Sequence, residues 1–378
     1  MKIFYWCPFL THVATINAVK NSVSSIKKYK KNAKVKILNS TGEWDFLNNN
    51  HHNFDILDVQ KLKIYKLLPK EGFLNSRLSF IIIGLLNIFP LIKTIKKERP
   101  DFLIIHLLTI LPIILSPILY KNTKIILRIS GLPNLKIGRG FIWKFFSKYI
   151  FAVTAPTKPT LDLLMQNNIF DKEKIFLLRD PIINYSQIFN EKKEKLEENF
   201  LNDKFYLSVG RLTNQKNFEF LINSFCKNIN KFKIKKIVIL GAGENEKKLK
   251  ELVAKYSMEN NIFLLGFKNN VYKYIFKAEA IISSSLYEDP GFFLIESAFL
   301  KKKIISSIVK NGPLEMFLIG NLCYFYESNN EYDFVNKIML SEKDTEGKMT
   351  LKALKYAKNF TSFNHYKNLN KLISQKIQ

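Results

Sequence analysis

Short apolar runs alternate with helical patterns along residues 204–300 of this chain. Each apolar run ends in glycine or in small hydroxyl residues and precedes a loop and a segment with apolar residues at helical spacing. The four runs are Lys204–Gly210, Lys235–Leu240, Asn261–Phe267 and Ala280–Ser285. Runs of this length predict buried strands, and their alternation with helices predicts a doubly wound parallel sheet. Ligands of such sheets bind beyond the carboxyl ends of the strands.

The N-terminal half shows the same alternation less clearly. Its predicted strands are Lys2–Trp6, Ala33–Asn39, Asp101–His106 and Lys124–Ile129. Helical spacing is present over Thr15–Tyr29 and from about Pro112 to Tyr120. The sequence therefore predicts an α/β protein with a second doubly wound sheet.

The length of 378 residues exceeds that of one ordinary core and predicts two domains. We place the boundary after Asp180–Asn184, ahead of a charged, poorly periodic connector at Glu191–Asn199. The predicted domains are residues 1–185 and 186–350, and the final segment, 351–378, is helical in pattern.

Two glutamates, Glu288 and Glu296, stand eight positions apart across a Pro-Gly turn that follows the last of the four strands. The order strand, glycine turn, helix places backbone N–H groups at a helix N-terminus, where the helix dipole favours an anion. An ionised carboxylate only accepts hydrogen bonds, so sugar or ribose hydroxyls are natural partners. Taken alone, the pair also fits a surface turn followed by an exposed acidic helix.

Cations and glycines follow two of the earlier strands. Arg211 and Lys216 lie five positions apart in one strand-to-helix loop and can converge on a diphosphate, Arg through its planar fork and Lys as a point charge. In a chain this basic, solvated loop residues are the alternative. Gly241 and Gly243 allow a tight turn and close backbone approach to a ligand, although a lone G-x-G is weak evidence for a nucleotide.

Five motifs in one order make the pattern specific. They are Ser208–Leu212 with Gln215–Phe218, Gly241–Glu244, Phe263–Phe267, the Glu288 and Glu296 block, and Asn311–Glu315. With this order and spacing over residues 205–317, the chain resembles the GT4 family of retaining glycosyltransferases, also called group 1. The resemblance implies a GT-B fold, in which two doubly wound, Rossmann-like domains face a central cleft. It also implies an acceptor-side N-terminal domain, a donor-binding second domain, and a helix within residues 351–378 that crosses back to the first.

The resemblance assigns roles to the residues of these motifs. Arg211 and Lys216 match cations that hold the donor diphosphate and the charge developing on the leaving nucleotide. Glu288 matches a glutamate placed near the transferred sugar, and these three are the expected catalytic residues. Glu296 matches the glutamate that binds the donor ribose. The other expected donor-binding residues are Gly241 and Gly243, Leu265 and Phe267 near the base, and Gly291, Phe292 and Phe293 near phosphate or sugar oxygens.

The chain departs from the family pattern in two loops of the N-terminal half. Cys7–His12, after the first strand, lacks the glycines that many family members carry there. The turn Ser130–Pro133 lacks the histidine that some members place close to the sugar. His106 falls in an apolar strand and is either a core histidine or a catalytic one. We assign no general base, because the resemblance implies a front-face transfer in which the departing phosphate can take the acceptor proton.

Two apolar stretches raise the question of membrane contact. Leu78–Ile95 and Phe102–Tyr120 are each near the lower length limit for a spanning helix. The second is better explained as a strand followed by a helix of the sheet, because prolines separate the two patterns. The first predicts either a helix on the bilayer surface or a buried helix. The first residues of the chain show no positively charged, cleavable signal pattern.

Basic residues are in large excess. The chain has 59 Lys and Arg against 32 Asp and Glu, a formal net charge of +27, with lysine clusters at 27–31, 93–97 and 301–303. Such a surface attracts anionic lipid headgroups or nucleic acid, unless it is merely solvated. No recognition-helix, zinc-finger or aromatic-strand motif is present, so we expect an anionic membrane surface and no nucleic acid.

The cysteines and acidic residues predict no metal. Cys7, Cys226 and Cys323 form no C-x-x-C pair, which indicates neither zinc nor a disulfide framework and favours a reducing, cytoplasmic setting. The sequence has no Asp-x-Asp motif of the kind that holds a nucleotide diphosphate through a metal ion. We therefore expect no cofactor, with phosphate charge met by Arg, Lys and helix dipoles.

Together with these features, the resemblance implies a retaining glycosyltransferase, a nucleotide-sugar-dependent hexosyltransferase. The expected donor is UDP- or GDP-linked. The expected acceptor is a growing glycan, a lipid-linked surface polysaccharide or lipopolysaccharide intermediate, reached peripherally from the inner face of the cell membrane. Two alternatives are a sugar-nucleotide epimerase of the same fold and a non-catalytic, basic GT-B-like binding protein.

Overall fold

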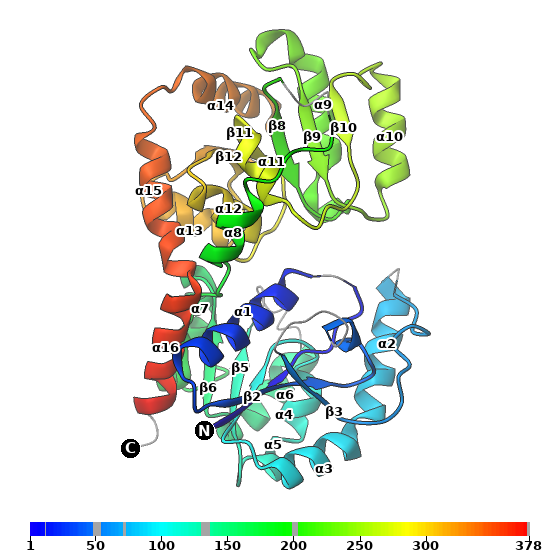
Figure 1. Cartoon of the computed structure of the whole chain (residues 1–378), viewed down its shortest axis with the longest axis vertical. Coiled ribbons are helices and arrows are strands. Elements are labelled where there is room, and N and C mark those ends of the chain that lie inside the picture. Colours follow the sequence, from blue (N-terminus) through cyan, green and yellow to red (C-terminus); the bar gives the residue numbers. More distant parts are fainter. Residues whose placement is uncertain (12, 48–53, 71–72, 130–136, 199–202, 376–378) are drawn as a thin grey trace. The chain divides into compact units, whose positions relative to one another are not determined.

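Two parallel sheets, one in each of two units of the chain, organise the structure (Figure 1). The computed structural model describes residues 1–11, 13–47, 54–70, 73–129, 137–198 and 203–375. Unit 1 consists of Met1–Pro181 and Ser362–Gln378, and unit 2 of Ile182–Thr361.

The sheet of unit 1 has seven strands in the order β3-β2-β1-β4-β5-β6-β7. Most of its strands are rich in Ile, Val and Leu, which suits strands covered on both faces. The strands are β1 (Lys2–Trp6), β2 (Lys34–Asn39), β3 (Asp55–Asp58), β4 (Phe102–Ile105), β5 (Lys124–Arg128), β6 (Ala152–Ala155) and β7 (Ile175–Leu177).

Helices cover both faces of this sheet. Successive side chains of β1 point to opposite sides. Phe4 and Trp6 enter one hydrophobic cluster, whereas Ile3 and Tyr5 enter another. The helices of unit 1 are α1 (Ala14–Tyr29), α2 (Phe73–Leu86), α3 (Ile88–Glu98), α4 (Ile110–Ile114), α5 (Ser116–Leu119), α6 (Ile137–Phe146), α7 (Lys158–Gln166) and α16 (Ser362–Gln375), with 3-10 helices at Asp45–Leu47, Ser147–Tyr149 and Lys172–Lys174.

The sheet of unit 2 has six strands in the order β10-β9-β8-β11-β12-β13. They are β8 (Tyr206–Val209), β9 (Ile237–Leu240), β10 (Ile262–Leu264), β11 (Ala280–Ser283), β12 (Lys303–Ser307) and β13 (Tyr324–Tyr326). Leu207 lies in the hydrophobic cluster on one side of the sheet and Tyr206 in the cluster on the other. This sheet is therefore also buried on both faces.

The helices of unit 2 connect these strands as a doubly wound fold requires. They are α8 (Tyr185–Glu191), α9 (Phe218–Asn228), α10 (Glu246–Lys255), α11 (Tyr272–Lys277), α12 (Phe292–Phe299), α13 (Gly312–Leu318), α14 (Glu331–Lys343) and α15 (Lys348–Ala357), with 3-10 helices at Asn214–Lys216, Ile229–Lys231 and Lys358–Phe360.

The unit boundaries differ from those placed on the sequence. The first unit ends at Pro181, four residues before the predicted limit at 185. The predicted final segment, 351–378, is divided between the units, because Tyr356 and Ala357 of α15 pack in the core of unit 2. The return to unit 1 begins only with α16, whose Leu369 and Ile373 pack in the core that contains β1.

A buried polar chain ties α16 to α1 and β1, which lie side by side in unit 1 (Figure 1). The Tyr5 hydroxyl and Ser22 Oγ are 2.6 Å apart, and Ser22 Oγ lies 2.7 Å from Nε2 of His365. The Nδ1 atom of His365 lies 2.7 Å from the carbonyl oxygen of Arg179. Burial lowers the pKa of His365 below its ordinary value of 6.5. A neutral imidazole donates to the carbonyl through Nδ1 and accepts from the serine through Nε2.

Candidate functional site

The carboxyl ends of β8, β9 and β11 lie at one edge of the unit 2 sheet, since β8 pairs in parallel with both neighbours. Backbone hydrogen bonds join the loops that follow β8 and β9. Leu212 N donates to Ala242 O over 3.0 Å, and Asn245 N donates to Leu212 O over 2.9 Å. The loop after β10 joins them, because Gly241 N donates to Gly266 O over 2.8 Å.

Gly241 and Gly243 make this close packing of loops possible. A Cβ atom on Gly241, whose φ is +143°, would lie 1.8 Å from the carbonyl oxygen of Gly210. A Cβ atom on Gly243 would lie 2.6 Å from the carbonyl oxygen of Leu212. Both distances are impossible for a side chain. The close approach that the sequence predicts at these glycines is thus, in this structure, an approach of protein backbone to protein backbone.

Lys216 and Glu288, 72 positions apart, form an ion pair in which the side chains are 18% and 13% exposed. Ser285 Oγ donates to the same carboxylate oxygen, Glu288 Oε1, over 2.7 Å. The Arg211 side chain is exposed and makes no ion pair with any described residue. The two predicted diphosphate ligands therefore differ, because Lys216 is held against Glu288 whereas Arg211 points to solvent.

Hydrogen bonds fasten the loop after β11 to the loop after β8. Ser284 Oγ donates to Lys216 O over 2.8 Å, and Leu286 N donates to Gln215 O over 2.8 Å. The Gln215 side-chain amide donates a hydrogen bond to Tyr287 O, also over 2.8 Å. Sequence reasoning assigned Gln215 and Ser285 no role of their own. The run of three serines that ends β11 is the signal that could have indicated polar contacts there.

The segment Asn311–Gly312 closes the other side of Glu288. Glu288 and Asn311 form a parallel bridge, and Gly312 N donates to Glu288 O over 3.2 Å. A Cβ atom on Gly312 would lie 1.8 Å from the carbonyl oxygen of Pro290. This glycine therefore allows the turn before α12 to lie against the start of α13.

Gly291 adopts a left-handed conformation, with φ of +85°, and directly precedes α12. The first amide groups of an α-helix have no partner within the helix and carry partial positive charge. Phe292 and Phe293 supply the first two of them, and both side chains are partly buried against the core of unit 2. The predicted glycine turn directly before a helix is thus present.

Glu296 lies one turn further along α12 and accepts a hydrogen bond at Oε1 from the Tyr272 hydroxyl over 3.0 Å. The pKa of Glu296 is raised to about 7, mainly by burial. The hydrogen bond from Tyr272 acts to lower this pKa, and the charge of Glu191 acts to raise it. Burial also raises the pKa of Tyr272 well above 10, so this hydroxyl keeps its proton. Sequence reasoning missed Tyr272, since no spacing connects it to Glu296.

Leu265 and Phe267 follow β10 at the same edge of the sheet. Leu265 is partly buried and its N–H donates to Ile239 O over 3.1 Å. Phe267 is 62% exposed. Gly266 between them has φ of +70°, which turns the chain toward the loop after β9. Unit 2 therefore brings all eleven predicted site residues to the carboxyl edge of one sheet.

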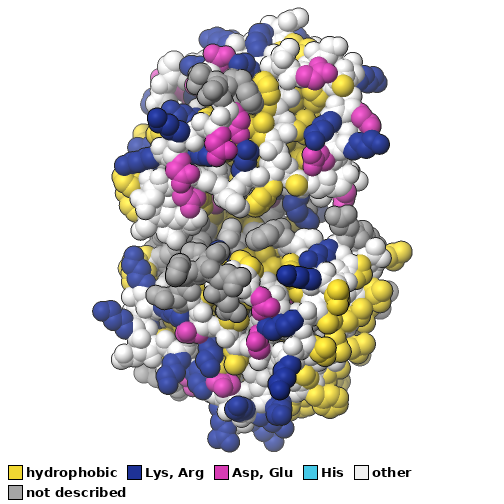
Figure 2. Space-filling view, turned by 45° about the vertical axis from the view of Figure 1, so that its right-hand side comes forward, with side chains coloured by type: hydrophobic (Ala, Val, Ile, Leu, Met, Phe, Trp, Pro, Cys, Tyr) yellow, Lys and Arg dark blue, Asp and Glu magenta, His cyan; other side chains and the backbone are white. Residues whose placement is uncertain are grey.

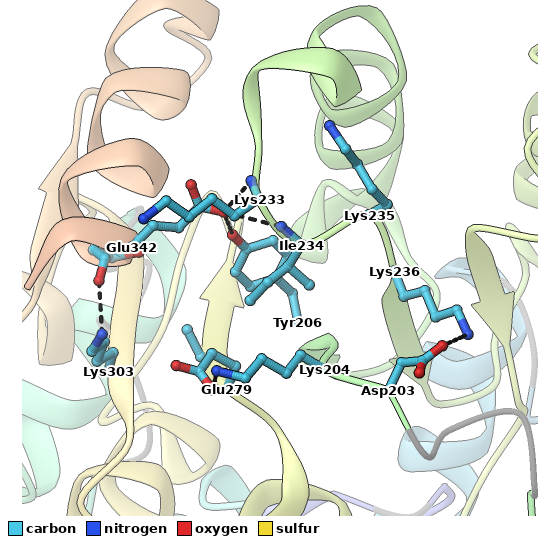
Figure 3. A pocket seen from close by; sticks show the side chains of 12 residues that line it. Asp203, Lys204, Tyr206, Lys233, Ile234, Lys235, Lys236, Glu279, Lys303 and Glu342 are labelled. Carbon is cyan, nitrogen blue, oxygen red and sulfur yellow. Dashed lines mark hydrogen bonds and ion pairs between the residues drawn. The ribbon is translucent and has the colours of Figure 1, made fainter.

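A pocket of about 410 Å³ lies at the opposite, amino-terminal edge of this sheet (Figure 3). Its walls include Lys204 before β8, Glu279 before β11 and Lys303 at the start of β12. Lys204 pairs with Glu279 at 3.3 Å, and Lys303 Nζ donates to Ser341 O over 2.8 Å. The hollow is therefore separate from the predicted site, and two ion pairs, Lys204–Glu279 and Lys236–Asp203, lie in its walls.

Two loops and one histidine of unit 1 were also singled out in the sequence. His12 and the turn 130–133 lie outside the described residues. His106 directly follows β4 and is 6% exposed, and burial, aided by the charge of Arg128, lowers its pKa well below 6.5. Among the described residues no hydrogen-bond partner reaches its Nδ1 atom. No group of three or more His, Cys, Asp or Glu side chains able to hold a metal ion occurs in the described part of the chain.

The sequence matches known proteins over part of its length. Residues 189–360 match the model of the family described as glycosyl transferases group 1. An uncharacterised glycosyltransferase of Methanocaldococcus jannaschii is 32% identical over 249 residues, which cover 61% of each chain. The N-acetylgalactosamine-N,N'-diacetylbacillosaminyl-diphospho-undecaprenol 4-alpha-N-acetylgalactosaminyltransferase of Campylobacter jejuni is 27% identical over 58% of this chain and 60% of its own. The chain thus spans about three fifths of the length of these relatives.

The fold extends the similarity to the whole chain. The crystal structure of Anabaena HepE in complex with UDP matches with a TM-score of 0.74 at 14% identity, covering 99% of this chain and 100% of that one. Two doubly wound parallel sheets of this kind define the GT-B fold class. Residues 189–360 are the part of this fold that matches the group 1 glycosyl transferases.

Replacing Gly241 by Ala should destabilise unit 2 and with it the site, because the new Cβ atom would clash with backbone rather than with a movable side chain. We expect a loss of roughly 2–5 kcal/mol in the free energy of unfolding, from overpacking together with the strain of a positive φ. Denaturant unfolding measures this loss.

Gly320→Ala is the matched control, since Gly320 has a similar φ of +136° but open space around the added atom. It should cost only the backbone strain, about 1–2 kcal/mol. Equal losses in the two variants would show that steric contact between the loops is unimportant.

Proposed function

We propose that this protein is a retaining glycosyltransferase that moves a hexose-type sugar from a nucleotide-sugar donor to a growing glycan. The observation that carries the proposal is the meeting of Lys216, Glu288 and the N-terminus of α12 at one sheet edge, with Glu296 in the same helix. Two findings support a UDP-linked donor. Residues 189–360 match the group 1 glycosyl transferases, and the similar Anabaena structure is a complex with UDP.

The charges of the site suit a nucleoside diphosphate. Arg211 is free to turn toward a phosphate, and the amides of Phe292 and Phe293 add partial positive charge without requiring a proton or a metal. Lys216 would exchange part of its contact with Glu288 for a phosphate oxygen. Glu296, held at Oε1 by Tyr272, offers its other oxygen to the ribose hydroxyls.

The proposed transfer keeps the configuration at the sugar carbon. The bond from that carbon to the donor phosphate breaks, the bond to the acceptor oxygen forms on the same face, and the acceptor proton passes to the departing phosphate. Lys216 and Arg211 stabilise the negative charge that develops on the leaving group. Glu288 lies beside Lys216, where a carboxylate can orient a sugar hydroxyl.

The proposed acceptor is a lipid-linked intermediate of a surface polysaccharide or lipopolysaccharide. The Campylobacter relative is named for an acceptor carried on diphospho-undecaprenol, which supports this class. We propose that the protein works in the cytoplasm, peripherally on the inner face of the cell membrane, and that its basic surface serves lipid rather than nucleic acid.

Replacing Arg211 or Lys216 by Ala should slow transfer and weaken UDP binding by at least about tenfold each, since a lost charge-assisted hydrogen bond costs roughly 1.5–3 kcal/mol. Isothermal titration with UDP and the rate of acceptor-dependent UDP release measure the two effects. Lys233→Ala, an exposed lysine at the opposite edge of the sheet, is the control and should leave both unchanged.

If both variants at the carboxyl edge match the parent protein, the donor binds elsewhere. UDP release without acceptor, accompanied by a changed sugar nucleotide, would point to an epimerase instead.

UDP affinity should rise between about pH 6 and 8, because the pKa of Glu296 is about 7 and only the carboxylate accepts from both ribose hydroxyls. The Glu296→Gln variant should show a smaller rise. Because the UDP phosphate titrates equally in both experiments, the difference between the parent and this variant reports the contribution of Glu296 alone. Tyr272→Phe should move the midpoint to higher pH, since the tyrosine hydroxyl lowers the pKa of Glu296. Identical pH profiles for parent and Glu296→Gln would exclude a contact between this carboxyl and the nucleotide.

We propose that transfer needs no metal ion, because the phosphate charge is met by Arg211, Lys216 and helix amides. Activity should therefore survive EDTA with less than about a twofold loss in rate. Assays of UDP release with EDTA, and then with added Mg²⁺ or Mn²⁺, test this. Abolition by EDTA with recovery on adding either ion would refute metal independence.

A further inference from the structure

An apolar stripe runs along the solvent face of α2 and continues onto α3. Leu74, Leu78, Ile81 and Leu85 follow one another at intervals of three and four positions and are 78%, 53%, 58% and 64% exposed. Phe89 at the start of α3 extends the stripe and is 80% exposed. Figure 2 shows hydrophobic side chains gathered at the lower right, on the side where Figure 1 draws α2. We call these five residues the α2 stripe.

The other side of the same helices packs into unit 1. Ile83 and Ser79 are fully buried, as is Leu91 of α3. Asn87 separates the helices and its side-chain amide donates to Ile83 O over 2.8 Å. The core of unit 1 is therefore packed by another side of these helices, not by the α2 stripe. The stripe is a second apolar face, turned to solvent, on a helix whose core face is already filled.

The helices α2 and α3 meet at a bend and do not form one long helix. In the described residues no single helix is long and apolar enough to span a bilayer, although Leu74–Leu86 with Ile88–Glu98 would pass by length and composition as a pair bent by 49°. Burial of Leu91 and Ile95 holds α3 against the protein. The sequence alone left open whether residues 78–95 form a buried helix or one on a bilayer surface, and the exposure of the α2 stripe favours the second.

Basic residues are in excess along the same part of the chain. Residues 61–99 contain nine Lys and Arg against two Glu. One of the two, Glu98, is engaged by Lys2 at 3.6 Å and Lys36 at 3.3 Å. Lys93, Lys96 and Lys97 of α3 are exposed beside the stripe. An exposed apolar stripe with basic residues at its margin matches an anionic lipid surface, where acyl chains receive the apolar side chains and headgroups meet the cations.

We propose that the α2 stripe and the α3 lysines dock unit 1 on the surface of an anionic bilayer. The charge argues against a second copy of this chain as the occupant, because pairing two such faces would bring two clusters of like charge together. The proposal rests on the proposed function in one respect, since a lipid-linked acceptor gives the enzyme a reason to reach the membrane.

Co-sedimentation of the full chain with vesicles of phosphatidylglycerol and phosphatidylcholine tests the proposal. The protein should bind the phosphatidylglycerol vesicles at about 0.1 M salt and bind pure phosphatidylcholine at least tenfold more weakly. The combined variant Leu78→Ser, Ile81→Ser, Leu85→Ser should bind the anionic vesicles at least about tenfold more weakly than the parent. Lys93→Gln, Lys96→Gln, Lys97→Gln should show a weaker dependence on anionic lipid.

The matched control replaces three exposed apolar residues of unit 2, Tyr332, Leu340 and Leu351, by Ser; these are 78%, 50% and 51% exposed. It should bind vesicles as the parent does. UDP affinity, measured on every variant, should be unchanged, so that failure of the proposed function appears in UDP binding and failure of docking appears only in sedimentation.

Three results would overturn the proposal. The first is equal vesicle binding by the parent and the stripe variant. The second is binding that resists alkaline carbonate extraction, which would mean an inserted helix pair. The third is a parent that is dimeric in sedimentation velocity and fails to bind vesicles while the stripe variant is monomeric, which would make this face a contact between two copies of the chain.

Discussion

The parallel pairing of β8 with β9 and β11 is the constraint on which the candidate site depends. It brings the loops after three strands to one edge, where Lys216 can meet Glu288 across 72 positions of sequence. The loops then have to lie backbone against backbone. Gly241 and Gly312 permit this, since a Cβ atom on either would lie 1.8 Å from a carbonyl oxygen. Strand pairing and two glycines thus determine how the backbone of these loops is arranged, independently of the charged side chains.

Lys216, Glu288 and Glu296 at this edge have partners within the protein, whereas Arg211 is exposed. Lys216 and Ser285 both contact Oε1 of Glu288, and Tyr272 donates to Glu296. A charge left without partners in such a partly buried place is costly, so these contacts stabilise unit 2 as well as shape the site. A nucleoside diphosphate brings negative phosphates and donor hydroxyls, which can replace part of these contacts with contacts of the same kind. Preformed partners of this sort keep the site in one arrangement.

The formal net charge of +27 is distributed unevenly over the molecule. At the amino-terminal edge of the unit 2 sheet, Lys236 pairs with Asp203 at 2.6 Å and Lys204 with Glu279 at 3.3 Å, so part of the local positive charge is offset. Along residues 61–99 the cations outnumber the acids by nine to two, and the exposed Lys93, Lys96 and Lys97 lie on α3, which also carries Phe89 of the α2 stripe. The total charge is therefore a poor guide to a binding surface, whereas its coincidence with exposed apolar side chains is specific.

The sequence by itself determined the elements whose signals are local. β1 has the predicted limits of Lys2–Trp6, and β8 to β11 fall within their predicted apolar runs, because burial on both faces leaves an apolar run in the sequence. β3 was missed, since Asp55–Asp58 has only two apolar residues at the edge of the sheet. Motif order likewise indicated Arg211 and Glu288, which stand in loops next to predicted strands.

Only the tertiary structure decided which distant groups meet and which faces stay exposed. Nothing in spacing connects Tyr272 to Glu296 across 24 positions, or places α15 with unit 2 and α16 with unit 1. The sequence of the apolar run at 78–95 does not tell whether the run is buried or exposed. In the structure Ile83 packs in the interior, whereas Ile81 and Leu85 are exposed to solvent. Hydrophobic period specifies a local conformation, but a helix with apolar residues on two sides can bury only the side that the rest of the fold reaches.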